Sequence, residues 1–188
     1  THYSAPRMVF AAAGKLDHDR IVGLVEEHFS ELPSGEGGET EPAVYRGGDT
    51  REDRVLEQAH LVMGFDGVGY HDPDYYAAGV ASTLLGGGMS SRLFQEIREK
   101  RGLAYGIGAS MRAYKNGGIL AGRTATRNDA AGETLRIIGE EWRRLAKEGP
   151  TAAEVDDAKT YLIGSFPLSL DSTGSFGSVL VTMQYYDL

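Results

Sequence analysis

The chain has 188 residues and a formal net charge of −8, with 41% hydrophobic and 24% charged residues. This composition is that of a globular protein with a sizeable core. Because nucleic-acid-binding domains usually present a basic face, the acidic balance argues against a nucleic-acid partner. No apolar run reaches the roughly 18 residues that a membrane span requires. The absence of cysteine excludes disulfides and thiolate metal ligands, and leaves the redox compartment open.

The first part of the chain predicts a strand, a helix and a linker. Residues 7–13, RMVFAAA, form a short apolar run that ends at Gly14 and predict a buried strand. Asp17 is a suitable N-cap for the next helix, whose apolar residues share one face: Ile21, Leu24, Val25 and Phe29. Residues 33–50 are rich in Gly, Pro, Glu and Thr, which predicts a linker at a domain boundary.

The rest of the chain predicts alternating strands and helices. Residues 55–65 have the pattern of a well-covered strand, and Asp72 with Pro73 predicts a helix start. Ser90 or Ser91 is expected to cap the next helix, which ends at Gly102. Residues 103–114 and 117–127 flank a turn signal at Lys115-Asn116-Gly117 and predict an antiparallel hairpin.

Two long helices and a third one follow. Asn128 is expected to cap a helix with these residues on one face: Leu135, Ile138, Trp142 and Leu145. Thr151 and Glu154 form a capping box that opens the second helix, and residues 171–188 predict a last helix. The order β-α-α-β-β-α-α predicts an α+β domain with a mainly antiparallel sheet.

The histidines lack the spacing of a metal site. Neither H-E-x-x-H nor H-x-x-E-H occurs, and we expect structural or solvated roles for His18, His28, His60 and His71. This chain alone is therefore expected to bind no zinc. One zinc per chain, found by elemental analysis after dialysis, would contradict this expectation.

The glycine triplet Gly86, Gly87 and Gly88 follows a predicted helix, and no Lys-Ser/Thr comes after it, so a phosphate loop is disfavoured. The simplest interpretation is a mobile turn and helix C-cap with at least one glycine at positive φ. The alternative is a flexible loop that touches a substrate. Gly106 and Gly108 share one strand face, which is left bare for a close backbone or a packed helix.

Four cations gather around one turn of this acidic chain: Arg92, Arg98, Lys100 and Arg101. One interpretation is a solvated helix face in which Arg92 and Lys100 alternate with Glu96 and Glu99. Arg98, however, lies in the last predicted turn, and the chain then reverses into the strand that carries Tyr105. This reversal can bring a guanidinium and a phenol to one edge. Both groups suit a peptide carbonyl or an oxyanion that forms from it.

The same residues carry a family resemblance. LLGGGMSSRLFQEIREKRGLAYGI resembles the signature of the C-terminal half of pitrilysin-family (M16) zinc peptidases, close to the mitochondrial processing peptidase branch. Further segments also match the family: residues 2–29, the helix after Asp72-Pro73, the hairpin, GPTAAEVDDAK and Ser165–Leu168. The resemblance implies a LuxS/MPP-like metallohydrolase (ferredoxin-like) α+β domain with helices on one face of the sheet.

The resemblance also implies a domain organisation. Residues 1–32 would be the tail of a preceding peptidase domain, residues 33–50 the linker, and residues 51–188 a substrate-binding domain that stops before its final helix and strand. The orphan strand Met8–Ala12 is expected to pair with the sheet of the second domain, in the same chain or exchanged within a homodimer. The compartment is left open, with a bacterial cytoplasm or periplasm as the expectation.

What the resemblance implies about function is a split active site. In the family, two similar domains close around an unfolded peptide, and H-x-x-E-H with a distant glutamate binds zinc in the first domain. Arg98 and Tyr105 would hold the substrate backbone and stabilise the tetrahedral intermediate. This chain would be the non-zinc half of a zinc endopeptidase acting on peptides or presequences, with the zinc-bearing domain in cis or in trans, and inactive alone. The alternative is a non-catalytic homologue with a structural or assembly role, which has no reason to keep both residues.

Overall fold

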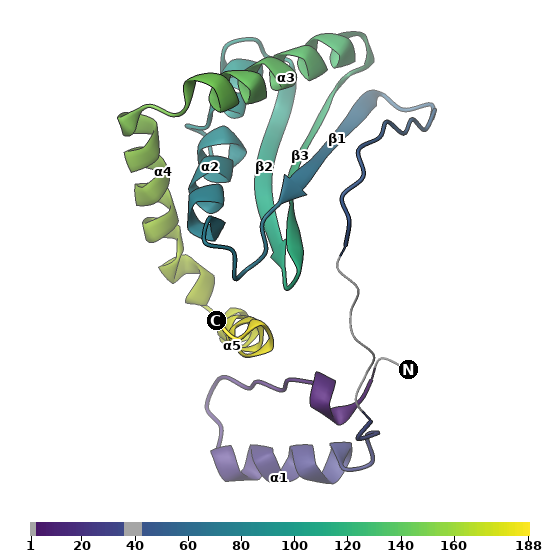
Figure 1. The fold of residues 1–188 in the computed structure, drawn as a ribbon, viewed down its shortest axis with the longest axis vertical. Helices are drawn as coiled ribbons and strands as arrows, with labels where there is room; N and C mark the ends of the chain where they lie inside the picture. Colours follow the sequence, from purple (N-terminus) through teal and green to yellow (C-terminus); the bar gives the residue numbers. More distant parts are fainter. Residues whose placement is uncertain (1–2, 36–42) are drawn as a thin grey trace. The chain divides into compact units, whose positions relative to one another are not determined.

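The computed structural model describes residues 3–35 and 43–188, so residues 36–42 of the predicted linker lie outside the described residues. The chain divides into two compact units (Figure 1). The smaller unit combines Thr1–Glu41 with Gly164–Leu188, and the larger unit is Pro42–Ile163. No helix in the described part of the chain is long and apolar enough to cross a membrane.

The larger unit is built on a three-stranded antiparallel sheet with the order β1-β3-β2. The strands are β1 (Gln58–Gly67), β2 (Ala104–Tyr114) and β3 (Gly117–Arg127). β2 and β3 form the hairpin that the sequence predicts. Residues 43–57 precede β1 and have no regular secondary structure. Within this segment, the Tyr45 hydroxyl donates a hydrogen bond of 2.8 Å to the Gly64 carbonyl of β1.

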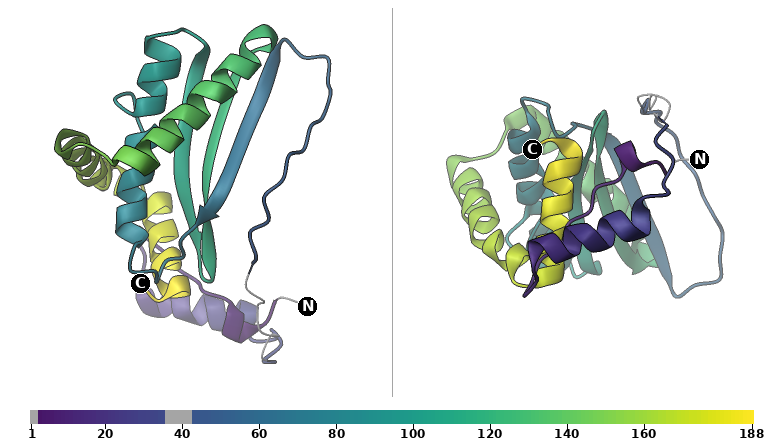
Figure 2. Two further views of the ribbon diagram at one scale, coloured as in Figure 1. Left: turned by 45° about the horizontal axis from the view of Figure 1, so that its top comes forward. Right: turned by 90° about the horizontal axis from the view of Figure 1, so that it is seen from below.

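Helices cover one face of this sheet (Figure 2). They are α2 (Tyr75–Gly86), the π-helix η2 (Phe94–Glu99) and α3 (Ala131–Glu148). The next helix along the chain is α4 (Ala152–Ser165). The core lies between the covering helices and the sheet, and its buried members are Leu85, Leu93, Ile97, Ala104, Ile107, Ala109, Ile137 and Ile138. The predicted α+β fold, with an antiparallel sheet covered by helices on one face, is confirmed.

Local signals at two helix starts behave as the sequence predicts. The Asp72 carboxylate accepts the backbone N–H of Asp74 at 2.8 Å, just before α2. At α4 the capping box is reciprocal: Thr151 N–H donates to the Glu154 carboxylate at 2.8 Å, and Glu154 N–H donates to Thr151 Oγ1 at 3.3 Å. At both helix starts, a side chain therefore accepts a hydrogen bond from a backbone N–H that the helix leaves without a partner.

The start of α3 differs from the prediction. Asn128 begins a 3₁₀ turn, Asn128–Ala130, and its side chain donates to the Leu56 carbonyl at 2.9 Å instead of capping α3. Leu135 is 49% exposed, whereas Ile137 and Ile138 are buried. The buried face of α3 therefore consists of Thr134, Ile137, Ile138 and Glu141 and excludes Leu135.

The smaller unit contains α1 (His18–Phe29), α5 (Thr173–Tyr186) and the 3₁₀ turns Ala5–Arg7 and Pro167–Leu170. The predicted cap of α1 is confirmed, because the Asp17 carboxylate accepts Arg20 N–H at 2.9 Å. The last predicted helix is also present as α5.

The strand predicted at residues 7–13 is wrong. Residues 8–13 have no regular secondary structure and belong to none of the three strands of the sheet. Ala11 and Ala13 border a groove along α5 instead. A strand requires a neighbouring backbone for its N–H and C=O groups, and the described residues of this unit contain no other strand. Among the described residues, Met8–Ala12 therefore form no strand, and the exchange of this segment between two copies stays a prediction.

Candidate functional site

Arg98 lies in the last turn of the π-helix η2, a helix type that the sequence did not predict. Lys100 N–H donates to the Gln95 carbonyl at 3.0 Å, five residues back. Two backbone hydrogen bonds close the end of this helix. Leu103 N–H donates to the Ile97 carbonyl at 2.9 Å, and Gly102 N–H donates to the Arg98 carbonyl at 3.0 Å. Gly102 has φ +60°, the left-handed conformation typical of this C-terminal motif. The turn therefore directs the chain at once into β2.

This reversal brings Arg98 and Tyr105 together. The guanidinium carbon of Arg98 lies 4.7 Å from the centroid of the Tyr105 ring and 4.8 Å from that of the Phe94 ring. Two aromatic faces attract the cation and restrict its position. The only ion pair of Arg98 among the described residues is with its neighbour Glu99, at 3.6 Å. Most of its N–H donors therefore remain available for a ligand.

Tyr105 points outward because β2 contains a bulge. Ala104 is opposite Thr126 and Ile107 is opposite Thr124, so Tyr105 and Gly106 together face a single residue of β3. Ala104 and Ile107 are both buried, whereas Tyr105 is 85% exposed. In a regular strand, Tyr105 would point to the same side as Ile107, into the helix layer. The bulge therefore turns the phenol away from the core and into solvent.

Two threonines of β3 hold the bulge from its buried side. Thr124 Oγ1 donates to the Gly106 carbonyl at 2.8 Å, and Thr126 Oγ1 donates to the Leu103 carbonyl at 2.6 Å. Both threonines are buried. They give the carbonyls of Leu103 and Gly106, on either side of Tyr105, a side-chain hydrogen bond from β3.

Thr124→Val is expected to loosen this bulge with little change in volume. The lost hydrogen bond should lower the free energy of unfolding by about 1 kcal/mol. Urea denaturation measures this change, and the backbone amide shifts of residues 104–107 report the conformation of the bulge. Thr182→Val is the matched control, because Thr182 Oγ1 donates to the Ser178 carbonyl on an exposed helix. Amide shifts at residues 104–107 that do not change in Thr124→Val would contradict the anchoring role.

The other three cations of the turn have carboxylate partners. Lys100 and Arg101 both bind Glu96. Arg92 is 9% exposed and donates to Glu154 at 2.5 and 2.8 Å. Arg92 is thus part of the core and not of a solvated face, which corrects the sequence interpretation of Arg92 with Lys100, Glu96 and Glu99. Sequence spacing carried no signal for this pair, because its members are 62 residues apart.

The Arg92–Glu154 pair also lowers the pKa of the Glu154 carboxyl group. The hydrogen bond from Arg92, with help from Thr151, lowers the pKa of Glu154 from 4.5 to about 2. Lys100 and Arg101 lower the pKa of Glu96 in the same way. Both carboxylates therefore remain ionised at neutral pH and hold their cations in place. Arg98 is the cation of this turn that is left to face Tyr105.

The glycine triplet ends α2 as predicted, with Gly87 as the C-cap, but the predicted positive φ is wrong. Gly87 is in the right-handed helical region, and none of the three glycines has positive φ. A Cβ on Gly86 would collide with the backbone nitrogen of Ala109 and lie 2.7 Å from its Cβ. A Cβ on Gly87 would lie 2.6 Å from Thr83 Cα. Gly86 therefore permits close approach of α2 to β2, whereas Gly87 leaves room for Thr83 within α2 itself. The role of the triplet as a substrate loop stays a prediction.

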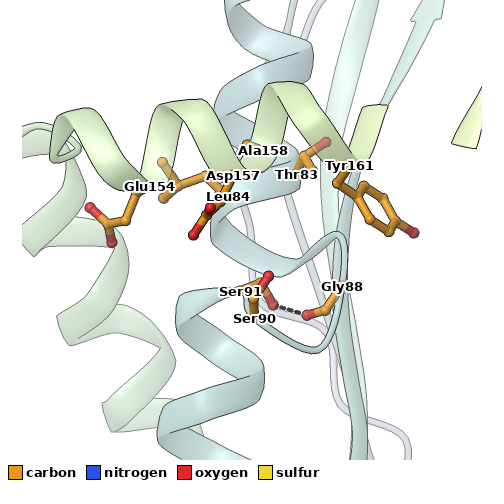
Figure 3. A pocket seen from close by; sticks show the side chains of 9 residues that line it. All are labelled: Thr83, Leu84, Gly88, Ser90, Ser91, Glu154, Asp157, Ala158 and Tyr161. Atoms are coloured by element: carbon orange, nitrogen blue, oxygen red, sulfur yellow. Dashed lines mark hydrogen bonds between the residues drawn. The ribbon is translucent and has the colours of Figure 1, made fainter. Parts of the chain in front are cut away.

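A small cavity lies next to this triplet (Figure 3). It measures about 40 Å³ and is bordered by Gly88, Ser91, Asp157 and Tyr161, among others. Ser91 Oγ donates to the Gly88 carbonyl at 2.5 Å, so this serine closes the turn. A space of this size holds water and not a peptide. The described residues also contain no cluster of three His, Cys, Asp or Glu side chains that could hold a metal ion.

A family model described as the peptidase M16 inactive domain matches residues 1–162. The chain belongs to the M16 inactive-domain family. This confirms the resemblance seen in the sequence. The M16 chain is 35% identical to an uncharacterised zinc protease of Streptomyces coelicolor over 183 residues, 93% of this chain and 40% of that protein. It is 41% identical to an uncharacterised zinc protease of Rickettsia felis over 162 residues, 86% of this chain and 39% of that protein.

Solved structures agree with this assignment. The crystal structure of a peptidase M16 inactive domain from Pseudomonas fluorescens has a TM-score of 0.71 and 29% identity, covering 93% of this chain and 42% of that one. A chain of complex III2 from Candida albicans has a TM-score of 0.76 at 21% identity, with 92% and 43% covered, which shows the fold alone. The M16 chain spans about two fifths of the length of the curated relatives it matches.

Proposed function

We propose that this chain is the non-zinc, substrate-binding half of an M16 zinc endopeptidase, to which it contributes Arg98 and Tyr105. The observation that carries the proposal is the pair itself. Of the four cations in the turn, Arg92 pairs with Glu154 of α4, and Lys100 and Arg101 pair with Glu96 of η2, whereas Arg98 is stacked on an exposed tyrosine. Pairing with a carboxylate explains the first three cations and does not explain an 85% exposed phenol on a bulge.

The zinc ion of the proposed enzyme would be bound elsewhere. No cluster of the described residues fits a metal, whereas the relatives from Streptomyces coelicolor and Rickettsia felis are named zinc proteases. The proposal therefore requires a zinc-bearing M16 domain as partner, in the same polypeptide or in another one. An unfolded peptide between the two halves would be the substrate.

The proposed roles of the two side chains follow from their chemistry. The Tyr105 hydroxyl is a neutral donor in solvent, able to bind a peptide carbonyl and to bind it more strongly as negative charge develops on the oxygen. The Arg98 guanidinium supplies positive charge and several planar donors to the same oxygen or to the peptide backbone. Stacking against Phe94 and Tyr105 fixes the cation beside the phenol before the substrate arrives.

The proposal is tested by joining this chain with a zinc-bearing M16 domain, either fused or mixed, and measuring hydrolysis of an unfolded fluorogenic peptide. We expect hydrolysis only when both halves are present, with loss on chelation and recovery on zinc addition. Equal hydrolysis by the zinc-bearing domain alone would contradict the proposal. A stable complex of the two halves without hydrolysis would instead favour a non-catalytic homologue with an assembly role.

A further inference from the structure

The face of the sheet that α2 and α3 leave uncovered has a surface of its own (Figure 2). We call it the open face. Alternate strand residues contribute to it: His60, Val62, Gly64 and Asp66 on β1, Gly106, Gly108, Ser110 and Arg112 on β2, and Ile119, Ala121, Arg123, Ala125 and Arg127 on β3. Val62 is 79% exposed, and Arg112 and Arg123 are exposed as well. The open face therefore combines apolar, small and cationic side chains.

The arginines of the open face form a row. Arg112 is opposite Ile119, Arg123 lies between Val62 and Gly108, and Arg127 is opposite Gln58. Measured along β3, where Ile119 marks the position of Arg112, successive arginines are four residues apart, or about 13 Å at the rise of a strand. Tyr105 lies at the same end as Arg127, because the bulge that carries it faces Ala125.

Arg112 and Arg123 have no carboxylate partner among the described residues, whereas nine of the nineteen Lys and Arg side chains do. Among the described residues, no hydrogen bond or ion pair joins either guanidinium to another group, whereas Arg127 lies 3.3 Å from Asp129. Asp66 is the one acid among the strand residues of the open face, and it lies on β1, across Ile119 from Arg112. The open face is thus locally cationic on a chain whose net charge is −8.

We propose that the open face binds an extended peptide through acidic side chains, with Arg112 and Arg123 as the residues that select them. This inference rests on the proposed function and adds a substrate class to it, namely unfolded segments with acids four residues apart. Side chains four residues apart in an extended peptide point to the same side, so their spacing matches that of the row. Gly64, Ala121 and Ser110 keep the floor between the cations low, and Val62 with Ile119 offers apolar contact beside them.

Salt weakens the long-range repulsion between an acidic peptide and the net negative chain more than it weakens the local attraction to the arginines. At an ionic strength of about 0.1 M, charges more than about 10 Å apart are largely screened, whereas a bound carboxylate beside a guanidinium is not. An acidic peptide is therefore expected to bind near physiological salt in spite of the net charge. Binding should weaken toward 1 M salt.

The experiment measures the fluorescence anisotropy of three labelled, unstructured twelve-residue peptides with the chain itself. The peptides differ only at two positions four residues apart, which hold Glu, Gln or Lys. We expect the Glu peptide to bind more tightly than the Gln and Lys peptides. Replacing both Arg112→Glu and Arg123→Glu should weaken the Glu peptide by about ten-fold, as expected for two exposed ion pairs turned repulsive. Asp66→Asn should strengthen its binding.

Matched variants decide between explanations. Arg136→Glu makes the same charge change on α3, where Arg136 pairs with Glu140, and should leave binding unchanged. Equal binding of the Glu, Gln and Lys peptides would overturn the proposal. So would a single-stranded oligonucleotide that binds more tightly than the Glu peptide and responds to the same two variants, because the row would then be a general polyanion site.

The preference for the Glu peptide is expected to be independent of catalysis. Arg98→Met and Tyr105→Phe should leave the preference for Glu over Gln and Lys intact, even where they abolish turnover in the assembled peptidase. Conversely, peptide hydrolysis with no acidic preference would retain the proposed function and overturn the further inference.

Discussion

Tyr105→Phe is expected to lower turnover of the assembled zinc peptidase by 10²–10³-fold, on the order of the loss seen when one oxyanion donor is removed. The substitution removes only the hydroxyl and keeps the ring that stacks on Arg98. Because Tyr105 is exposed and its hydroxyl has no protein partner among the described residues, the melting temperature should change little. Steady-state kinetics and thermal unfolding of the same samples measure both quantities.

Arg98→Met should act in the same direction as Tyr105→Phe. If the two side chains act as one unit, the double variant should lose little more than the more damaging single variant, because the effects of such residues do not add. Tyr114→Phe is the matched control, since Tyr114 is another exposed tyrosine at the far end of β2. Unchanged turnover in Tyr105→Phe, with a lower melting temperature, would mean that the tyrosine serves packing alone.

Glu154→Gln is expected to destabilise the chain by about 2–4 kcal/mol at pH 7, because it leaves the buried Arg92 without its anion. The Arg92 side chain is 9% exposed and Glu154 is 29% exposed, so water replaces the lost partner only in part. The loss should be visible in urea denaturation. Glu140→Gln, which breaks the exposed pair with Arg136, should cost less than about 0.5 kcal/mol.

The pH dependence of this pair has a definite sign. The pKa of Glu154 falls from 4.5 to about 2 in the folded chain, so folding favours the ionised carboxylate. This contribution is complete above about pH 4.5, and it is lost as the pH falls through about 2. The difference in stability between the native chain and Glu154→Gln should therefore shrink across that range. A difference that stays constant from pH 7 to pH 2 would show that the pair does not carry it.

Short-range signals in the sequence determined much of this fold. The Thr151–Glu154 capping box, the Asp17 cap and the Lys115-Asn116-Gly117 turn depend on neighbours within a few residues, and the structure confirms all three. The proximity of Arg98 and Tyr105 is of the same kind. One glycine reversal joins the helix to the strand, so seven residues are enough to bring the guanidinium onto the ring.

Other features were decided by tertiary structure, because their partners are distant in sequence. Glu154 withdraws Arg92 from solvent across 62 residues, which no charge pattern within one helix could indicate. The role of Gly86 depends on the backbone of Ala109, and the outward direction of Tyr105 depends on a bulge that Thr124 holds from β3. Residues 8–13 show that a local pattern alone does not produce a strand when the distant partner is missing from the described residues. Their apolar pattern suits a strand, but a strand exists only where a second backbone accepts its hydrogen bonds.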